Sequence, residues 1–115
     1  MHKHKFGLFA EYAVIIRYML QGYLPVKHRW KSNLGEIDII LKRGKSIIFC
    51  EVKARSSDVL DASECVSYNQ QKRLKKSSEY FLALHTKWCI KKVRFDLAIV
   101  HSFTNIKIYK DWIGL

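Results

Sequence analysis

The chain of 115 residues contains little proline, glycine or acidic side chain, and it lacks a long uncharged apolar run. One Pro and five Gly form no linker or low-complexity tract, so we expect one domain over residues 1–115. The three Cys include no C-x-x-C pair, which argues against a zinc site and favours reduced thiols. The apolar segment 6–20 contains Glu11 and Arg17 and is too short and too charged to span a bilayer. We therefore expect a cytoplasmic protein without membrane association.

Acidic residues are scarce beside basic ones. Ten Asp plus Glu face twenty-one Lys plus Arg, which gives a formal net charge of +11. Such a balance favours a polyanionic partner, with nucleic acid ahead of an anionic membrane surface, although a merely basic protein is the alternative. The 49% hydrophobic and 13% aromatic content indicates a folded globular chain.

The spacing of apolar residues predicts an α/β domain with the element order α-β-β-β-α-β-β. Apolar residues three and four apart predict a first helix that ends at Gly22. Ser67-Tyr-Asn-Gln70 fits a capping box and predicts the start of a second helix. The predicted ranges are helices 6–21 and 68–85 and strands 23–30, 36–42, 46–54, 93–100 and 106–109.

Charged side chains interrupt two neighbouring predicted strands, Asp38 in one and Glu51 and Lys53 in the next. Side chains alternate along a strand, so Glu51 and Lys53 share one face, and the short turn 43–45 brings Asp38 beside them. Because an unpaired charge inside an apolar strand is costly, we expect these residues to have a functional role. The alternative is a Glu51–Lys53 ion pair, which contributes little at a surface.

Alternation along the strand 36–42 makes two further predictions. Ile37, Ile39 and Leu41 share one face, and Glu36 and Asp38 share the other. We expect Glu36 to be solvated at the strand edge rather than to contact a metal ion.

Two carboxylates on paired strands suit a magnesium site. Mg²⁺ prefers hard oxygen ligands and retains several waters, so Asp38, Glu51 and the carbonyl of Val52 would suffice. Such an ion activates a water molecule and neutralises charge on a scissile phosphate. Lys53 would hold the attacking water or stabilise the developing charge. The residues therefore predict a centre that hydrolyses phosphodiesters.

The run Gly35-Glu-Ile-Asp38, followed by Phe49-Cys-Glu-Val-Lys-Ala-Arg55, resembles the signature of the YraN-like bacterial family. That family is similar to the PD-(D/E)XK nucleases and to archaeal Holliday-junction resolvases. The likeness extends over nearly the whole chain and includes Glu11 in the first helix, Gln-Gln-Lys-Arg-Leu in the second, and Arg94-Phe-Asp96. It implies a restriction-endonuclease-like core, with a mixed central sheet flanked by helices, that depends on Mg²⁺ or Mn²⁺.

The resemblance also implies roles for individual residues. Asp38 matches the metal-binding aspartate, Glu51 the second acid and Lys53 the catalytic lysine. Glu11 matches a helix glutamate that often reaches toward the metal. Its alternative is an ion pair with Arg17 or a neighbouring lysine.

For two other positions the sequence leaves alternative roles. Gln70 or Gln71 falls where a polar helix residue completes many such sites. Asp96, between Phe95 and Leu97, has either a site role or a structural hydrogen bond.

Basic residues cluster near the start of the second predicted helix, where they oppose the helix dipole unless an anion lies nearby. The expected phosphate contacts are Arg55, Lys72, Arg73 and Lys76, together with the polar loop 55–64. A solvated helix face is the alternative for this cluster.

The leading hypothesis is a metal-dependent endonuclease-like protein that binds nucleic acid, DNA rather than RNA, and hydrolyses its phosphodiesters. A junction-cutting member would be a symmetric homodimer, because it must cut two strands. The second hypothesis is a non-catalytic nucleic-acid-binding module on the same fold. A protein-interaction or membrane-surface role for the positive charge ranks last.

Overall fold

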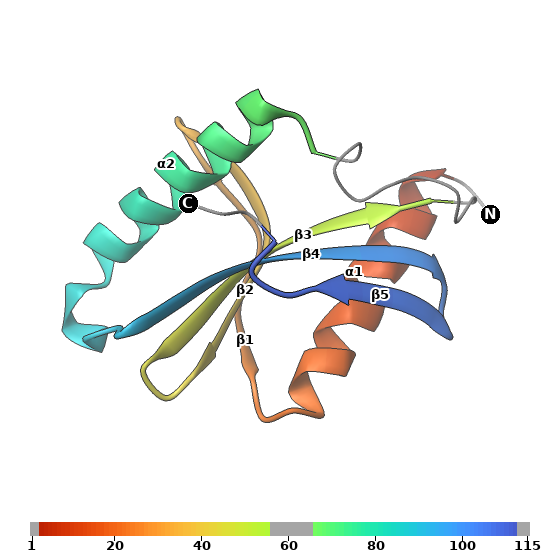
Figure 1. The fold of residues 1–115 in the computed structure, drawn as a ribbon, viewed down its shortest axis with the longest axis horizontal. Coiled ribbons are helices and arrows are strands. Elements are labelled where there is room, and N and C mark those ends of the chain that lie inside the picture. The colour runs from red at the N-terminus through yellow and green to blue at the C-terminus, as the bar shows by residue number, and fades with distance from the viewer. Residues whose placement is uncertain (1–2, 56–65, 113–115) are drawn as a thin grey trace.

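The computed structural model describes residues 3–55 and 66–112, in which a five-stranded sheet separates two long helices (Figure 1). The predicted α/β class and element order are confirmed. A short 3-10 helix between α2 and β4 was not predicted. The elements are α1 (Lys3–Met19), β1 (Leu24–Ser32), β2 (Gly35–Arg43), β3 (Ser46–Ala54), α2 (Tyr68–Leu84), η2 (Thr86–Trp88), β4 (Lys92–Ser102) and β5 (Asn105–Tyr109).

The sheet is mixed, and its strands lie in the order β1-β2-β3-β4-β5. All neighbours are antiparallel except β3 and β4, which run parallel from the pair Ser46–Lys92 to the pair Ala54–Val100. Parallel neighbours need a crossover connection, and the segment that contains α2 supplies it. Figure 1 shows the strong twist of the sheet, with the β1–β2 hairpin running in a different direction from β4 and β5.

Local sequence signals account for the helix ends. Gly22 has a φ of +91°, and its N–H donates to the carbonyl of Met19, so α1 stops where glycine was expected to stop it. Ser67 and Gln70 form the predicted capping box, each side chain accepting the other residue's backbone N–H. A cap of this kind stabilises a helix by about 1 kcal/mol.

The helices cover opposite faces of the sheet. The apolar side of α1 packs on one cluster of buried side chains and α2 packs on another, which explains why β3 is apolar on both faces. Cys50 is fully buried in the first cluster, and burial raises the pKa of its thiol. No helix among the described residues is long and apolar enough to cross a bilayer. The α1 cluster includes Ala10, Val14, Tyr18, Ile39, Leu41, Ile48 and Val52, and the α2 cluster Ile37, Ile40, Ile47, Phe49, Leu74 and Phe81.

Regular alternation fails in the first half of β2. Ile37 packs in the α2 cluster and Ile39 in the α1 cluster, so the prediction that they share a face is wrong. Asp38 lies between these two residues. Opposite Asp38 on β1 is Arg29, whose backbone is left-handed with a φ of +57°. A residue in this region of φ and ψ redirects the chain, and both strands exchange their faces here.

Candidate functional site

The candidate site is an open cavity of about 530 Å³ where β2 separates from β3. The backbone pairing of these strands ends at Ile39 and Cys50, although both strands continue beyond that pair. Side chains from both helices can reach the opening, because the sheet parts there. The lining residues are Glu11 from α1, Gly35, Glu36 and Asp38 from β2, Glu51, Val52 and Lys53 from β3, and Gln70, Arg73 and Leu74 from α2. All four residues predicted to be catalytic therefore line one cavity.

Asp38 is held by a backbone group of the neighbouring strand. Its Oδ2 accepts the N–H of Val52 at 2.9 Å, just beyond the end of the β2–β3 pairing. A hydrogen bond to the charged form of a carboxylate favours ionisation and fixes its orientation. Val52 thus reaches the site through its N–H, while the metal contact of its carbonyl stays a prediction.

Glu51 faces the carboxylate of Asp38. Burial, a hydrogen bond with Asp38 and the charge of Asp38 raise the pKa of Glu51 to about 9. The charge of Lys53 lowers this pKa and that of Glu11 raises it further. Two carboxylates this close do not both ionise readily without another cation, so the raised pKa of Glu51 corresponds to one proton retained at neutral pH.

Glu11 lines the cavity with its carboxylate already engaged. Its Oε1 contacts Arg29 Nε at 2.9 Å and His28 Nε2 at 2.5 Å, and its Oε2 accepts from Arg29 at 3.4 Å. The expected alternative, an ion pair with Arg17 or a neighbouring lysine, is wrong in its partner. The sequence carried no signal for His28 or Arg29, because the contact depends on how α1 packs on β1.

The donor set limits which ion the cavity can hold. Among residues 3–55 and 66–112, no group of three or more His, Cys, Asp or Glu side chains is placed to bind a metal ion. The carboxylates of Asp38 and Glu51 would attract a cation, and binding of the cation would release the proton that the pair retains. Mg²⁺ and its substitutes fit this set, since Mg²⁺ is commonly held by one or two carboxylates and retains several waters.

The two glutamines of α2 are occupied by local hydrogen bonds. Gln70 lines the cavity, but its side-chain oxygen accepts the N–H of Ser67 in the capping box. Gln71 donates to the carbonyl of Val66 at 3.2 Å. Their expected contribution to the site stays a prediction, and in this arrangement it requires Gln70 to leave its cap.

Only part of the predicted phosphate-binding set borders the cavity. Arg73 lines it, whereas the ammonium of Lys72 lies 4.8 Å from the ring centre of Tyr68 and Lys76 is exposed further along α2. Arg55 donates to the carbonyl of Ala54 at the end of β3. The rest of the predicted loop, residues 56–64, lies outside the described residues.

Gly35 sets how closely α2 approaches the strand that carries Asp38. Its φ is +145°, and a Cβ atom there would lie 2.9 Å from the hydroxyl oxygen of the buried Ser77. Glycine is thus required by conformation and by space. This close packing brings Arg73 to the cavity, a role that the sequence motif did not reveal.

Asp96 lies apart from the cavity lining and is fully buried. Its carboxylate accepts two hydrogen bonds from Arg94 at 2.9 Å, one from the hydroxyl of Tyr18 and one from the N–H of Asp111. Burial, with the nearby Cys50 and Asp96, raises the pKa of Tyr18 above its ordinary value, so Tyr18 remains a donor. Of the two expected roles, the geometry supports the structural one.

Comparison with known sequences identifies the family. The profile described as uncharacterised protein family UPF0102 matches residues 10–100. A UPF0102 protein of Ruegeria pomeroyi is 35% identical over 111 residues, which cover 96% of this chain and 89% of the relative. Similar proteins come from Caldicellulosiruptor bescii, 34% identical with 96% and 98% covered, and Ehrlichia ruminantium, 37% identical with 87% and 76% covered. The resemblance to the YraN-like family is confirmed, and the chain belongs to the uncharacterised protein family UPF0102.

Proposed function

We propose that this protein is a metal-dependent nuclease that hydrolyses DNA phosphodiesters on a restriction-endonuclease-like core. The observation that carries the proposal is the convergence of Asp38, Glu51 and Lys53 on one open cavity at the point where two strands separate. The net charge of +11 and the resemblance of the G-E-I-D and E-V-K segments to PD-(D/E)XK nucleases support it.

Each side chain of the site would have a separate role in such a reaction. Bound Mg²⁺ or Mn²⁺ would lower the pKa of a water molecule and act as a Lewis acid on the phosphate. Asp38, oriented by the N–H of Val52, and Glu51, after release of its proton, would be the ligands. Lys53 would orient the attacking water or stabilise negative charge that develops on the phosphate. Glu11, held by Arg29, would act on the pair through its charge.

Basic residues near the cavity would position the substrate. Arg73 borders the acid pair, while Arg55, Lys72 and Lys76 would contact the backbone further away. DNA is the proposed polymer rather than RNA, and a member that cuts both strands of a junction would act as a homodimer.

Cleavage assays with paired variants test this function. Purified protein should nick plasmid or branched DNA in Mn²⁺ or Mg²⁺, and Asp38→Asn or Glu51→Gln should lower the rate about 100-fold or more. Glu36→Gln is the matched control, because Glu36 also borders the cavity but its side chain is exposed and pairs with Lys31 at 3.8 Å. Cleavage that persists in Asp38→Asn, or in EDTA, would contradict the proposal.

One observation favours the non-catalytic nucleic-acid-binding module as a second candidate. Glu11 and Gln70, which complete the expected site, have their side chains engaged in other contacts. A binding module would retain salt-sensitive DNA binding and show no cleavage in either ion. Its affinity would also be unchanged in Asp38→Asn.

A further inference from the structure

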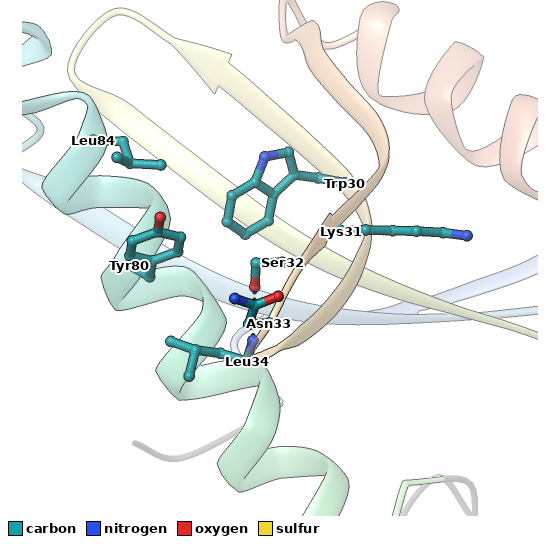
Figure 2. A pocket seen from close by; sticks show the side chains of 7 residues that line it. All are labelled: Trp30, Lys31, Ser32, Asn33, Leu34, Tyr80 and Leu84. Atoms are coloured by element: carbon teal, nitrogen blue, oxygen red, sulfur yellow. Dashed lines mark hydrogen bonds between the residues drawn. The ribbon is translucent and has the colours of Figure 1, made fainter.

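A second pocket lies beside the candidate centre, on the α2 side of the sheet. It is open, has a volume of about 590 Å³ and runs between the end of β1, the β1–β2 turn and the second half of α2. Figure 2 shows the rings of Trp30 and Tyr80 pointing toward one another across it, with Leu84 and Leu34 at the sides. We call it the Trp30–Tyr80 pocket; its lining is Trp30, Lys31, Ser32, Asn33, Leu34, Tyr80 and Leu84.

The two aromatic rings differ in how firmly they are held. Trp30 packs edge-on against the buried Phe81, with ring centres 5.2 Å apart. Tyr80 is 45% exposed, and its ring is tilted by 40° to that of Trp30 with centres 6.1 Å apart. The rings therefore do not stack on one another, and they present a fixed aromatic wall and an accessible one.

The polar groups of the pocket suit a neutral, planar ligand. Asn33 lies exposed in the turn, and an amide can both donate and accept hydrogen bonds. The side chain of Lys31 is directed away from the aromatic rings in Figure 2, and its ammonium lies 3.8 Å from Glu36. The pocket thus combines aromatic faces, aliphatic edges and one amide, with charge kept outside.

The pocket and the candidate centre share two elements. Both use the segment around the β1–β2 turn, and α2 contributes Arg73 to the centre and Tyr80 to the pocket. These residues are seven apart, about 10 Å along a helix axis. Lys76 is exposed at a position three residues after Arg73 and four before Tyr80, which places it on the same side of the helix between the two sites.

We propose that the Trp30–Tyr80 pocket holds one unpaired nucleobase of the DNA strand whose backbone passes the Asp38–Glu51 pair. This inference rests on the proposed function and specifies its substrate. A separation of about 10 Å is spanned by at most about three nucleotides, the number at the stacked rise of 3.4 Å per nucleotide. Arg73 and Lys76 supply cations along that path, and aromatic side chains bind bases of any sequence by stacking.

An unpaired base is required, because protein forms both walls of the pocket and a base within a duplex cannot enter it. The protein should therefore bind single-stranded, flapped or branched DNA more tightly than an uninterrupted duplex. Base–aromatic stacking typically contributes enough that removal of one ring weakens binding about tenfold.

Fluorescence anisotropy on the whole protein tests the pocket without cleavage. Fluorescein-labelled single-stranded and blunt duplex oligonucleotides are titrated in EDTA. Tyr80→Ala should weaken binding of the single strand about tenfold and change duplex binding by less than twofold, while Tyr80→Phe should bind nearly as the wild type does. Tyr12→Ala is the matched control: this tyrosine is 55% exposed on α1, across the sheet.

The salt dependence separates stacking from charge. Tyr80→Ala should leave the slope of log K against log salt unchanged, whereas Lys76→Ala should reduce its magnitude by about 0.7 on a single strand. Equal losses on both DNA forms, or no loss in Tyr80→Ala, would overturn the pocket assignment. Specific binding of an apolar peptide that Tyr80→Ala abolishes, without discrimination between the DNA forms, would also overturn it.

The pocket and the nuclease function can fail separately. Tyr80-dependent single-strand binding without cleavage in Mn²⁺ would retain the pocket and refute the hydrolase. Cleavage that depends on Asp38, with Tyr80→Ala fully active and equal in affinity to the wild type, would retain the hydrolase and refute the pocket.

Discussion

Two groups of acids lie on the central strands of this protein, one fully buried and one partly exposed, and their partners differ. Asp96 on β4 has no exposed surface, yet Arg94 neutralises it and two further donors complete its hydrogen bonds. Asp38 and Glu51, on β2 and β3, face one another in an open cavity, and Glu51 keeps a proton. Burial of an acid is therefore a poor guide to function; the charge of its neighbours is a better one.

The first group is complete as it stands, and the second would gain from a cation. Removing an acid should accordingly cost much more stability in the first group than in the second. A divalent ion should also distinguish them, because the Asp38–Glu51 pair lines an open cavity and Asp96 does not. Three measurements test this contrast.

The largest effect should come from the same substitution made in each group. Asp96→Asn leaves the Arg94 guanidinium without its partner and should lower the free energy of unfolding by about 3–5 kcal/mol. Asp38→Asn can still accept the Val52 N–H through its amide oxygen and leaves no buried charge unpaired, so its loss should stay below about 1 kcal/mol. Urea denaturation at pH 7 in EDTA measures both.

If Asp96→Asn fails to fold, Tyr18→Phe provides a milder test. It removes one hydrogen bond to Asp96 and should cost about 1–2 kcal/mol. If Asp38→Asn proves as destabilising as Asp96→Asn, the proposed difference between the two groups of acids is wrong.

A smaller effect should follow the addition of Mn²⁺ to the wild type. Ligand that binds only the folded state adds about 2.7 kcal/mol at one hundred times its Kd, and thermal unfolding reports this gain. Asp38→Asn and Glu51→Gln should lose it, and Glu36→Gln should keep it. An equal gain in all four proteins would place the ion elsewhere.

The smallest effect should be a dependence on pH in the absence of divalent ions. The pKa of Glu51 is raised from 4.5 to about 9 on folding, so between these values the folded chain holds a proton that the unfolded chain has released. Stability attributable to this group therefore falls as the pH rises, by at most about 1.4 kcal/mol from pH 6 to 7. Glu51→Gln should show a correspondingly flatter profile.

Urea midpoints at both pH values give the comparison directly. Identical slopes for the wild type and Glu51→Gln would mean that Glu51 is ionised in the folded state. The carboxylate pair would then carry its full charge without a cation, and the contrast with Asp96 would disappear.

Much of the fold could be predicted from residue spacing. The strands, both long helices, the stop at Gly22 and the cap at Ser67 follow from local signals, which act within a few residues. Strand alternation and the short turn also brought Asp38, Glu51 and Lys53 together, because a hairpin has few degrees of freedom.

What the sequence did not reveal depends on contacts between distant segments. The face exchange at Asp38 accompanies the left-handed backbone of Arg29, a residue type that gives no warning of it. The Glu11–Arg29 and Tyr18–Asp96 contacts come from packing α1 against the sheet, and the Trp30–Tyr80 pocket comes from docking α2. Trp30 packs against the α2 cluster and also lines an opening.

The sequence separation of the residues that each hydrogen bond joins also has a consequence for the order of folding. The Asp38–Val52 bond joins residues 14 apart, whereas the Tyr18–Asp96 bond joins residues 78 apart. Local contacts close fast and distant ones slowly. The acid pair should therefore assemble early, within the β2–β3 hairpin, and Asp96 should find its partners late. During synthesis on the ribosome, the residues of the hairpin are all joined before Asp96 and two of its partners, Arg94 and Asp111, are added to the chain.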